Sequence, residues 1–354
     1  MHVSTPHLTK KTFLMVQKIM NSLKSYKLFA AFVFFISTVS TFSPTLAATE
    51  MGIVTGGTKG TYIQIGYDIS KLVKQKGIYL NVEPSNGSLD NIADVYERKD
   101  VQLGIVQSDV LASIRSSGDE QLFNIAKQIR MIFPLYNEEV HILASRSIKS
   151  FSDLKGKIVA IGSKGSGTAL TASLLFEIAG VTPSETKHVD AKKALMLLRS
   201  EVIDAMFYIS GYPVSLFSNI YTENLHLLPI TDKRIAEHYV PSIIPAGTYS
   251  WQKKPVKTFA VKAVLMSYGY DESHQNCKNV GEIGRIIYDN EGWLKKNGHA
   301  KWEHVDLDAK LAGWEQYKCV TNAIQDIKKA QQEDSDNDTS VKNLLRKKVS
   351  NTSN

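Results

Sequence analysis

Cysteine is scarce in this sequence. The 354 residues include only two, Cys277 and Cys319. Two isolated cysteines do not provide the paired short spacings of a structural zinc site, so a site of that kind is excluded. In an oxidising compartment the two could form one disulfide, whereas in the cytoplasm they would stay reduced. The compartment therefore decides their state, and the N-terminal sequence bears on the compartment.

Motifs for catalysis and metal binding are also lacking. The histidines form no H-E-x-x-H pattern, and the calcium-like spacing Asp334, Asp336, Asp338 lacks the loop's glycine and closing glutamate. Residues 152–155 fit S-x-x-K, but the S-D-N match at 335–337 lies in a polar tail, and K-T-G and G-x-S-x-G are absent. We expect no catalytic residue, no metal and no cofactor, and keep a periplasmic serine hydrolase-type enzyme as the alternative.

A concentrated basic region is absent beyond the N-terminus. The chain has 42 Lys and Arg against 35 Asp and Glu, a net charge of +7. Residues 1–47 hold five lysines and no acidic residue, so they carry five of these seven charges. Binding to nucleic acid needs a basic face. We therefore expect no nucleic-acid partner.

The N-terminal segment has three consecutive parts. Its lysines precede the uncharged apolar run 28–39, which is followed by the small-residue segment Ser43–Ala48. The run is about a dozen residues, and a membrane-spanning helix needs about 20, so a membrane anchor is the weaker alternative. The parts predict a secretory signal peptide over 1–47, cleaved near Ala47, with Met20 as an alternative start. The mature chain is then periplasmic, where Cys277 and Cys319 are expected to pair.

Strand-like and helix-like segments alternate after residue 48. Short apolar runs at 52–55, 79–82 and 101–106 are separated by helical patterns, and the series restarts at 140–144. This alternation is typical of an α/β fold with parallel strands covered by helices. Two units of similar design are therefore expected.

The boundaries of these units follow from the same pattern. Lobe 1 is expected over 48–137 and lobe 2 over 138–244. The more helical stretch from about 245 to 330 is expected to return to lobe 1 and complete it. Residues 331–354 are polar and charged, which predicts a disordered tail.

Glycine-rich loops recur where a strand passes into a helix. Thr55–Tyr62 and Gly162–Thr168 are two such loops, and Ser85–Asn91 is a third of the same kind. Glycine lets the backbone approach a ligand, and the free N–H groups of a helix start favour an anion. None has P-loop or G-x-G-x-x-G spacing, and one such loop alone is usually only a turn. Their recurrence in both units, beyond the carboxyl ends of strands, predicts a ligand cleft.

Several sequence blocks resemble those of one family in their order and spacing. They are Thr55–Tyr62, Ser85–Asn91, Gln107–Asp109, Tyr136–His141, Asp153–Lys157 and Gly162–Thr168. Together they resemble the TAXI family, the extracytoplasmic solute-binding proteins associated with TRAP transporters. The resemblance covers about residues 50–250. The chain departs from the family pattern at Asn137, where proline is frequent, and at Lys59, where a small residue is usual.

The resemblance implies a type II-like periplasmic binding protein with two lobes, two mixed sheets flanked by helices, and a hinge. The implied ligand is a small anionic solute, such as glutamate, a dicarboxylate or a 2-oxo acid, and the implied partner is a TRAP-type membrane permease. A solute-binding protein of an ABC transporter is the alternative. The ligand contacts that the resemblance implies are Gly60, Thr61, Tyr62, Ser85, Ser88, Gln107, Ser166, Gly167 and Thr168, with Tyr136 and Glu138 at the hinge or cleft wall.

Overall fold

The computed structural model describes residues 49–116, 119–220 and 223–325. The predicted signal peptide and the predicted tail over 331–354 lie outside the described residues. The residues described here belong to one compact unit that begins at Ala48. No helix in the described ranges combines the length and the apolar character needed to cross a membrane.

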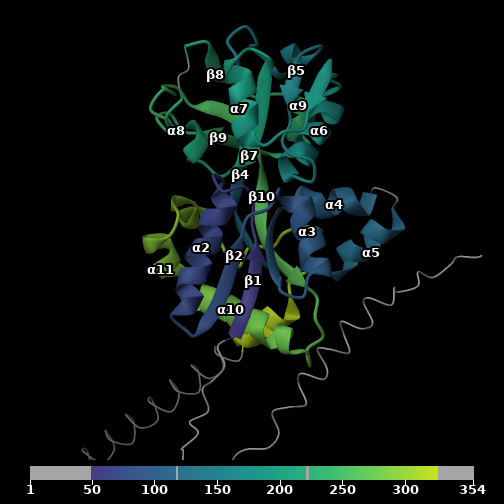
Figure 1. The fold of residues 1–354 in the computed structure, drawn as a ribbon, viewed down its shortest axis with the longest axis vertical. Coiled ribbons are helices and arrows are strands. Elements are labelled where there is room, and N and C mark those ends of the chain that lie inside the picture. Colours follow the sequence, from purple (N-terminus) through teal and green to yellow (C-terminus); the bar gives the residue numbers. More distant parts are fainter. Residues whose placement is uncertain (1–48, 117–118, 221–222, 326–354) are drawn as a thin grey trace, which may run out of the picture. The chain divides into compact units, whose positions relative to one another are not determined.

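A mixed sheet of ten strands forms the centre of this unit (Figure 1). In sheet order the strands are β2 (Ile78–Glu83), β1 (Thr49–Val54), β3 (Leu103–Gln107), β10 (Val256–Tyr268), β4 (Ile129–Ser145), β7 (Ala205–Ser210), β5 (Ile158–Ala160) and β6 (Glu185–Lys187). Two further strands pair at the side, β8 (Leu225–Leu227) with β4 and β9 (Val240–Ile244) with β10. Strands β1, β2 and β3 are parallel, as are β5, β6 and β7, while β4 and β10 are antiparallel to their neighbours.

The predicted mixed α/β fold is confirmed, with one difference in how the strands connect. The sequence predicts two sheets, and the structure joins them into one through two long strands. Strand β4 has 17 residues and β10 has 13, and they pair with each other over 129–139 and 260–268. Both exceed the usual strand of about 5–6 residues. On its other side, β10 pairs with β3 of the first parallel group and β4 pairs with β7 of the second.

Helices cover the sheet. They are α2 (Thr61–Lys74), α3 (Ser88–Glu97), α4 (Asp109–Ser116), α5 (Glu120–Gln128), α6 (Gly167–Ala179), α7 (Ala191–Arg199), α8 (Ser215–Ser218), α9 (Lys233–Ala236), α10 (Gln275–Asp289) and α11 (Glu291–Asn297), with 3-10 turns η1 (Phe151–Leu154) and η2 (Ala300–His304). Within the stretch expected to be more helical, residues 275–297 form two helices, α10 and α11. Asn290 separates them, and its side-chain amide donates to the carbonyl of Ile286.

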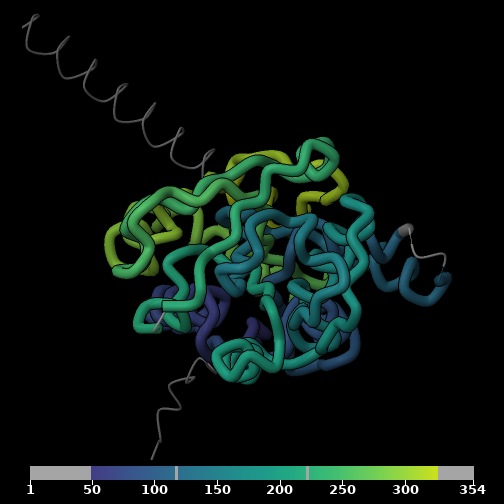
Figure 2. The backbone as a smooth tube through the Cα atoms, turned by 90° about the horizontal axis from the view of Figure 1, so that it is seen from above, coloured from purple at the N-terminus to yellow at the C-terminus, as the bar shows by residue number. Residues whose placement is uncertain are grey.

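Apolar side chains gather into separate cores on either side of the middle of the sheet. Two clusters draw only on residues 51–136 and 263–320, and two others only on 140–261. We call the first group lobe 1 and the second lobe 2. In Figure 1, α2, α3 and α10 lie with lobe 1, and α6 and α7 with lobe 2. Figure 2, viewed from the lobe 2 side, shows the teal and green chain of lobe 2 towards the viewer.

The chain returns to lobe 1 later than the sequence suggests. The expected return is near residue 245, but Tyr249, Phe259 and Val261 pack with the lobe 2 clusters. The reason is that the first part of β10, up to Ala260, pairs with β9, and β10 pairs with β4 only from Ala260 onward. The register between β10 and β4 shifts between Lys262 and Val264, close to the point where the chain passes from one lobe to the other.

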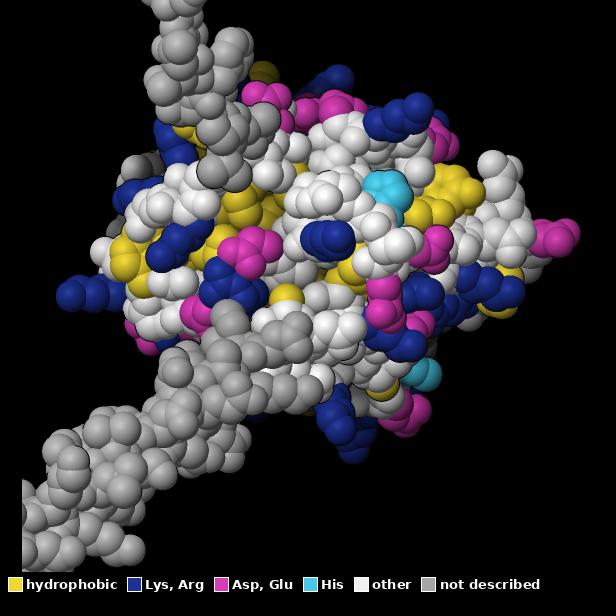
Figure 3. Space-filling model, turned by 90° about the horizontal axis from the view of Figure 1, so that it is seen from below, with side chains coloured by type: hydrophobic (Ala, Val, Ile, Leu, Met, Phe, Trp, Pro, Cys, Tyr) yellow, Lys and Arg dark blue, Asp and Glu magenta, His cyan; other side chains and the backbone are white. Residues whose placement is uncertain are grey.

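Charges of both signs are mixed on the surface shown in Figure 3. On the described part of that face, Lys and Arg side chains are interspersed with Asp and Glu. This face offers no single basic patch of the kind that nucleic acid needs.

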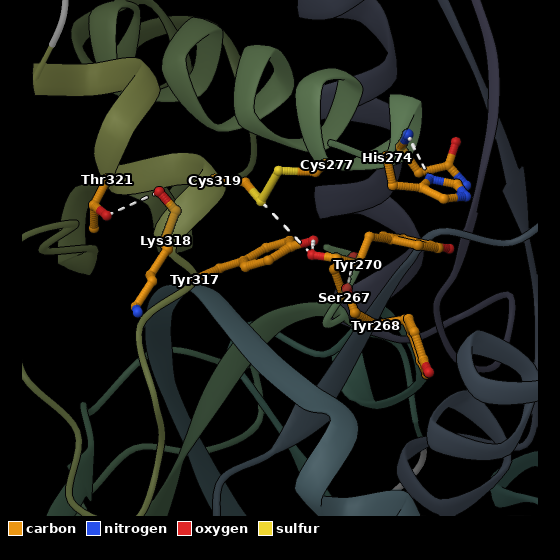
Figure 4. Close-up of a disulfide and its surroundings, with 10 residues drawn as sticks. Ser267, Tyr268, Tyr270, His274, Cys277, Tyr317, Lys318, Cys319 and Thr321 are labelled. Carbon is orange, nitrogen blue, oxygen red and sulfur yellow. Dashed lines mark hydrogen bonds between the residues drawn. A yellow bond between two sulfur atoms is a disulfide. The ribbon is translucent and has the colours of Figure 1, made fainter. Parts of the chain in front are cut away.

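The two cysteines form a disulfide in lobe 1 (Figure 4). Cys277 lies in the first turn of α10, and Cys319 is 42 residues further along the chain. Both are buried in the largest lobe 1 cluster, near Tyr270 and Tyr317. The bond ties the C-terminal part of the described chain to α10.

Candidate functional site

A cavity lies between the lobes, at the carboxyl ends of β1, β3 and β7. Its volume is about 70 Å³. The starts of α2, α3 and α6 all reach it. Eight of the nine ligand contacts implied by the resemblance line it, namely Gly60, Thr61, Tyr62, Ser88, Gln107, Ser166, Gly167 and Thr168, and so does Glu138.

Two predicted residues do not line the cavity. The hydroxyl of Ser85 donates to Asn91 Oδ1 at 2.5 Å, which fixes the loop before α3. Tyr136 is fully buried behind the wall, where its ring lies 2.7 Å from the position that a Cβ on Gly211 would take. No hydrogen bond to its hydroxyl is found among the described residues. Both residues therefore support the cavity from outside.

Sequence reasoning missed part of the lobe 2 wall. Tyr208, Ile209 and Ser210 line the cavity at the end of β7. The same signal that identified Gln107, a polar residue at the carboxyl end of a parallel strand, was available at Ser210. The remaining residues not predicted as contacts belong to the glycine-rich loops, namely Gly56, Gly57, Asn86 and Gly87.

The start of α2 requires a residue without a side chain. Gly60 is the N-cap of α2, has an extended backbone, and makes no side-chain cap. A Cβ there would lie 3.1 Å from the Tyr208 hydroxyl. Because no side chain covers the first turn, its N–H groups stay available to the cavity.

The start of α6 lies against lobe 1. Ser166 caps the helix by accepting from the N–H of Ala169 at 3.1 Å. A Cβ on Gly167 would lie 2.1 Å from Gln107 Oε1 and 2.5 Å from Ser88 Oγ, both in lobe 1. Glycine at this position therefore allows the two lobes to come together.

Direct hydrogen bonds join the lobes around the cavity. The hydroxyl of Thr61 donates to the carbonyl of Gly211 at 2.8 Å, and the N–H of Leu89 donates to the carbonyl of Gly165 at 2.9 Å. With these bonds in place, the structure represents a closed arrangement of the lobes.

Glu138 gives the cavity its one ionisable carboxyl. Its Oε2 accepts a 2.6 Å hydrogen bond from the Tyr62 hydroxyl, and both side chains are buried. Burial raises the pKa of Glu138 well above its usual value, and the Tyr62 hydrogen bond opposes that shift. Burial next to Glu138 also raises the pKa of Tyr208 to about 12. No lysine or arginine is among the described residues that line the cavity.

The neighbouring Glu139 is paired away from the cavity. Its carboxylate lies 2.8 Å from the Lys301 ammonium, which also stands 3.7 Å from the centre of the Tyr212 ring. Both members of the pair are buried, at 2% exposed each. Burial raises the pKa of Glu139, and its attraction to Lys301 opposes the shift. The charge of Lys301 is thus committed to Glu139 and does not serve a solute.

A model of the NMT1-like family matches residues 53–314. The chain belongs to the NMT1-like family. The matched residues include every residue that lines the cavity.

Solved structures resemble this NMT1-like chain at low sequence identity. A protein from Bordetella bronchiseptica RB50 is 14% identical, with 78% of this chain and 89% of that one covered and a TM-score of 0.50. The substrate-binding protein of an amino acid ABC transporter is 13% identical, with 70% and 97% covered and a TM-score of 0.43. A protein solved with L-arginine bound is 10% identical, with 75% and 96% covered and a TM-score of 0.47. These likenesses concern the fold alone.

The NMT1-like cavity offers groups for binding. Hydroxyls, amides and helix-start N–H groups surround one buried carboxyl. In the described ranges, no three His, Cys, Asp or Glu side chains stand close enough to hold a metal ion. The arrangement suits a small polar molecule held by hydrogen bonds.

Proposed function

We propose that this NMT1-like protein is a periplasmic solute-binding protein of a TRAP-type transport system. One observation carries the proposal: the N-terminal ends of α2, α3 and α6 converge on one cavity between two lobes. Helix starts favour anionic groups because their N–H groups and dipoles point at the ligand. Closure of lobes about a hinge is a common way to enclose such a ligand.

The solute is a small organic anion that also carries an ammonium group, for which L-glutamate is the model. The N–H groups at the helix starts can donate to a carboxylate, while a carboxyl oxygen of Glu138 can accept from a cationic group. A dicarboxylate or a 2-oxo acid would place oxygen atoms against Glu138, which would then have to be protonated and donate to them, whereas a bound ammonium group favours the ionised form of Glu138. Among the solutes implied by the resemblance, glutamate therefore fits the cavity best.

Delivery to a permease is the remaining part of the proposal. The signal-type N-terminus supports export, and the TAXI-like blocks favour a TRAP-type permease over an ABC transporter. Uptake of labelled L-glutamate should depend on this protein, and should be lost when the genes of a TRAP-type permease are deleted. Uptake that instead needs ATP-driven transport would favour the ABC alternative.

Thermal unfolding of the exported protein tests the binding role. L-Glutamate at about 100 times its Kd should raise Tm by about 5 °C, because a ligand that binds only the folded state stabilises it. The double variant Thr61→Ala, Thr168→Ala should abolish this shift, since both residues line the cavity. Ser173→Ala is the matched control. It removes the hydroxyl of an exposed residue on the same helix as Thr168, and should keep the full shift.

Two outcomes would contradict the proposal. One is an equal Tm shift in the double variant and in the wild type. The other is the absence of a shift with any amino acid, dicarboxylate or 2-oxo acid, together with hydrolysis of a test ester. That second result would favour the enzyme alternative.

A further inference from the structure

Three polar side chains connect the cavity wall to the interior of the lobe interface. Gln107 lines the cavity at the end of β3, Thr171 lies in α6, and Asp109 begins α4. Thr171 Oγ1 lies 3.1 Å from Gln107 Oε1 and 2.7 Å from Asp109 Oδ2. Gln107 and Asp109 belong to lobe 1 and Thr171 to lobe 2, so the chain of contacts spans the interface.

The Thr171 hydroxyl has only one proton, which limits how these contacts can form. It can donate either to Gln107 or to Asp109, but not to both. If it donates to Gln107 Oε1, the contact with Asp109 Oδ2 is a hydrogen bond only when Asp109 carries the proton. If it donates to Asp109, the Gln107 amide must turn its nitrogen towards Thr171 instead.

The surroundings of Asp109 favour its protonated form. Its Oδ1 atom is buried without a partner among the described residues, and Tyr239 approaches Oδ2 at 3.1 Å with a neutral hydroxyl. No ion pair to Asp109 is found within the described ranges. Burial accordingly raises the pKa of Asp109. An uncompensated buried carboxylate is costly, so the acid form is preferred.

Other titratable groups near Asp109 do not reverse this preference. Glu138 lies close enough to Asp109 for the two charges to interact, and each would disfavour ionisation of the other. Glu177, His238 and Lys262 line the groove next to Asp109. Of these, the Lys262 ammonium is attracted towards Asp306 and Glu139.

The same contacts decide which end of the Gln107 amide meets the solute. With Oε1 held by Thr171, Nε2 is the end left over, and no hydrogen bond from it is found within the described part of the chain. An amide nitrogen donates to a carboxylate, whereas an amide oxygen would repel one.

We propose that Thr171 and Asp109 are positioning residues for solute recognition, which hold Gln107 with its amide nitrogen facing the carboxylate of the solute. The inference rests on the proposed function, because it takes an anionic solute as given. Neither residue lines the cavity, so neither touches the solute. Their effect passes through Gln107.

Calorimetric titration of the full exported protein with L-glutamate tests this role. Thr171→Val keeps the shape of the side chain and removes the hydroxyl, and should weaken binding about tenfold, equivalent to about 1.4 kcal/mol. Thr171→Ser should restore binding to within about twofold. Asp109→Asn also should stay within about twofold, because the Asn amide can donate to Thr171 as the acid does.

Two comparisons separate positioning from a merely structural role. Tyr239→Phe is the matched control: it removes another hydroxyl from the same Asp109 oxygen but does not contact Gln107. It should leave the Kd unchanged. The affinity of the wild type should also include a component that falls as pH rises through the pKa of Asp109, and Asp109→Asn should lack that component.

A double-mutant cycle guards against loss of folding. Gln107→Met should weaken binding as much as Thr171→Val, and the double variant no further, since one residue acts through the other. Additive losses, or wild-type binding by Thr171→Val, would overturn the inference. If Asp109→Asn weakened binding as much as Thr171→Val does, the assignment of a proton to Asp109 would be overturned. Failure of the wild type to bind any carboxylate would instead contradict the proposed function itself.

Discussion

Tyr62 donates its hydroxyl to Glu138 at 2.6 Å, which joins the start of α2 to the long strand β4 inside the cavity. The bond holds one carboxyl oxygen, and the other stays available to a ligand. Because burial raises the pKa of Glu138, the free energy of unfolding should depend on pH.

Glu138→Gln should make the protein more stable than the wild type at high pH, and equally stable at low pH. The folded-state pKa of Glu138 lies above its usual value of 4.5, so the wild type keeps full stability from this group below about pH 4.5. That contribution is lost as pH rises through the folded-state pKa, because the buried group must then ionise. Denaturant unfolding should show the two proteins equal near pH 4 and the variant more stable by about 1 kcal/mol or more at pH 8. Equal stability at both pH values would contradict the assigned environment.

Gly167→Ala should keep the lobes apart. The added methyl would stand 2.1 Å from Gln107 Oε1 and 2.5 Å from Ser88 Oγ. Closure then requires those side chains to move, and binding of L-glutamate should weaken by about tenfold or more, while Tm without ligand changes little. Small-angle scattering with ligand should show a larger radius of gyration than for the wild type. Gly292→Ala, in exposed helix with no atom near the new methyl, is the control and should behave as the wild type does.

Lys301→Met should be strongly destabilising. It leaves the buried Glu139 carboxylate without its partner at 2.8 Å, and breaking a buried pair in this way costs about 3–5 kcal/mol. The double variant Glu139→Gln, Lys301→Met removes both charges and should recover a large part of that loss. Urea unfolding of the three proteins and the Glu139→Gln single variant completes the cycle. A double variant as unstable as the sum of the singles would show that the two side chains act independently.

Replacing both cysteines with alanine should lower the free energy of unfolding by about 4 kcal/mol. The disulfide closes a loop with a sequence separation of 42, and a cross-link of that span restricts the unfolded chain. The wild type in reducing agent should show the same loss. This comparison distinguishes the effect of the disulfide from the effect of removing the two sulfur atoms from the core. If reduction left the unfolding midpoint unchanged, the bond would contribute little to stability.

Local patterns were enough to predict most of the cavity wall. Gly60, Ser88 and Gly167 follow strands and begin helices, and the local sequence indicates both the end of each strand and the start of each helix. The recurrence of such loops in two units then indicated that they face one another. Ser210 was missed although it stands at the end of a strand, as Gln107 does.

Long-range pairing was less accessible from the sequence. Nothing local to Thr171 shows that it meets Gln107 and Asp109, which are more than 60 residues away. Likewise, the pattern of residues 245–261 does not show which lobe they join, because strand β10 is mostly buried on both sides of the crossing. Partners of this kind are set by tertiary packing.

The passage of β4 and β10 through both lobes has a mechanical consequence. Two adjacent strands that are hydrogen-bonded to each other resist bending within the plane of the sheet, but they twist more easily. We expect any motion between the lobes to be mainly a rotation, with its axis near the irregular pairing between Lys262 and Val264. Under the proposed function, we therefore expect solutes of different size to change how far the lobes rotate and not the direction of the rotation.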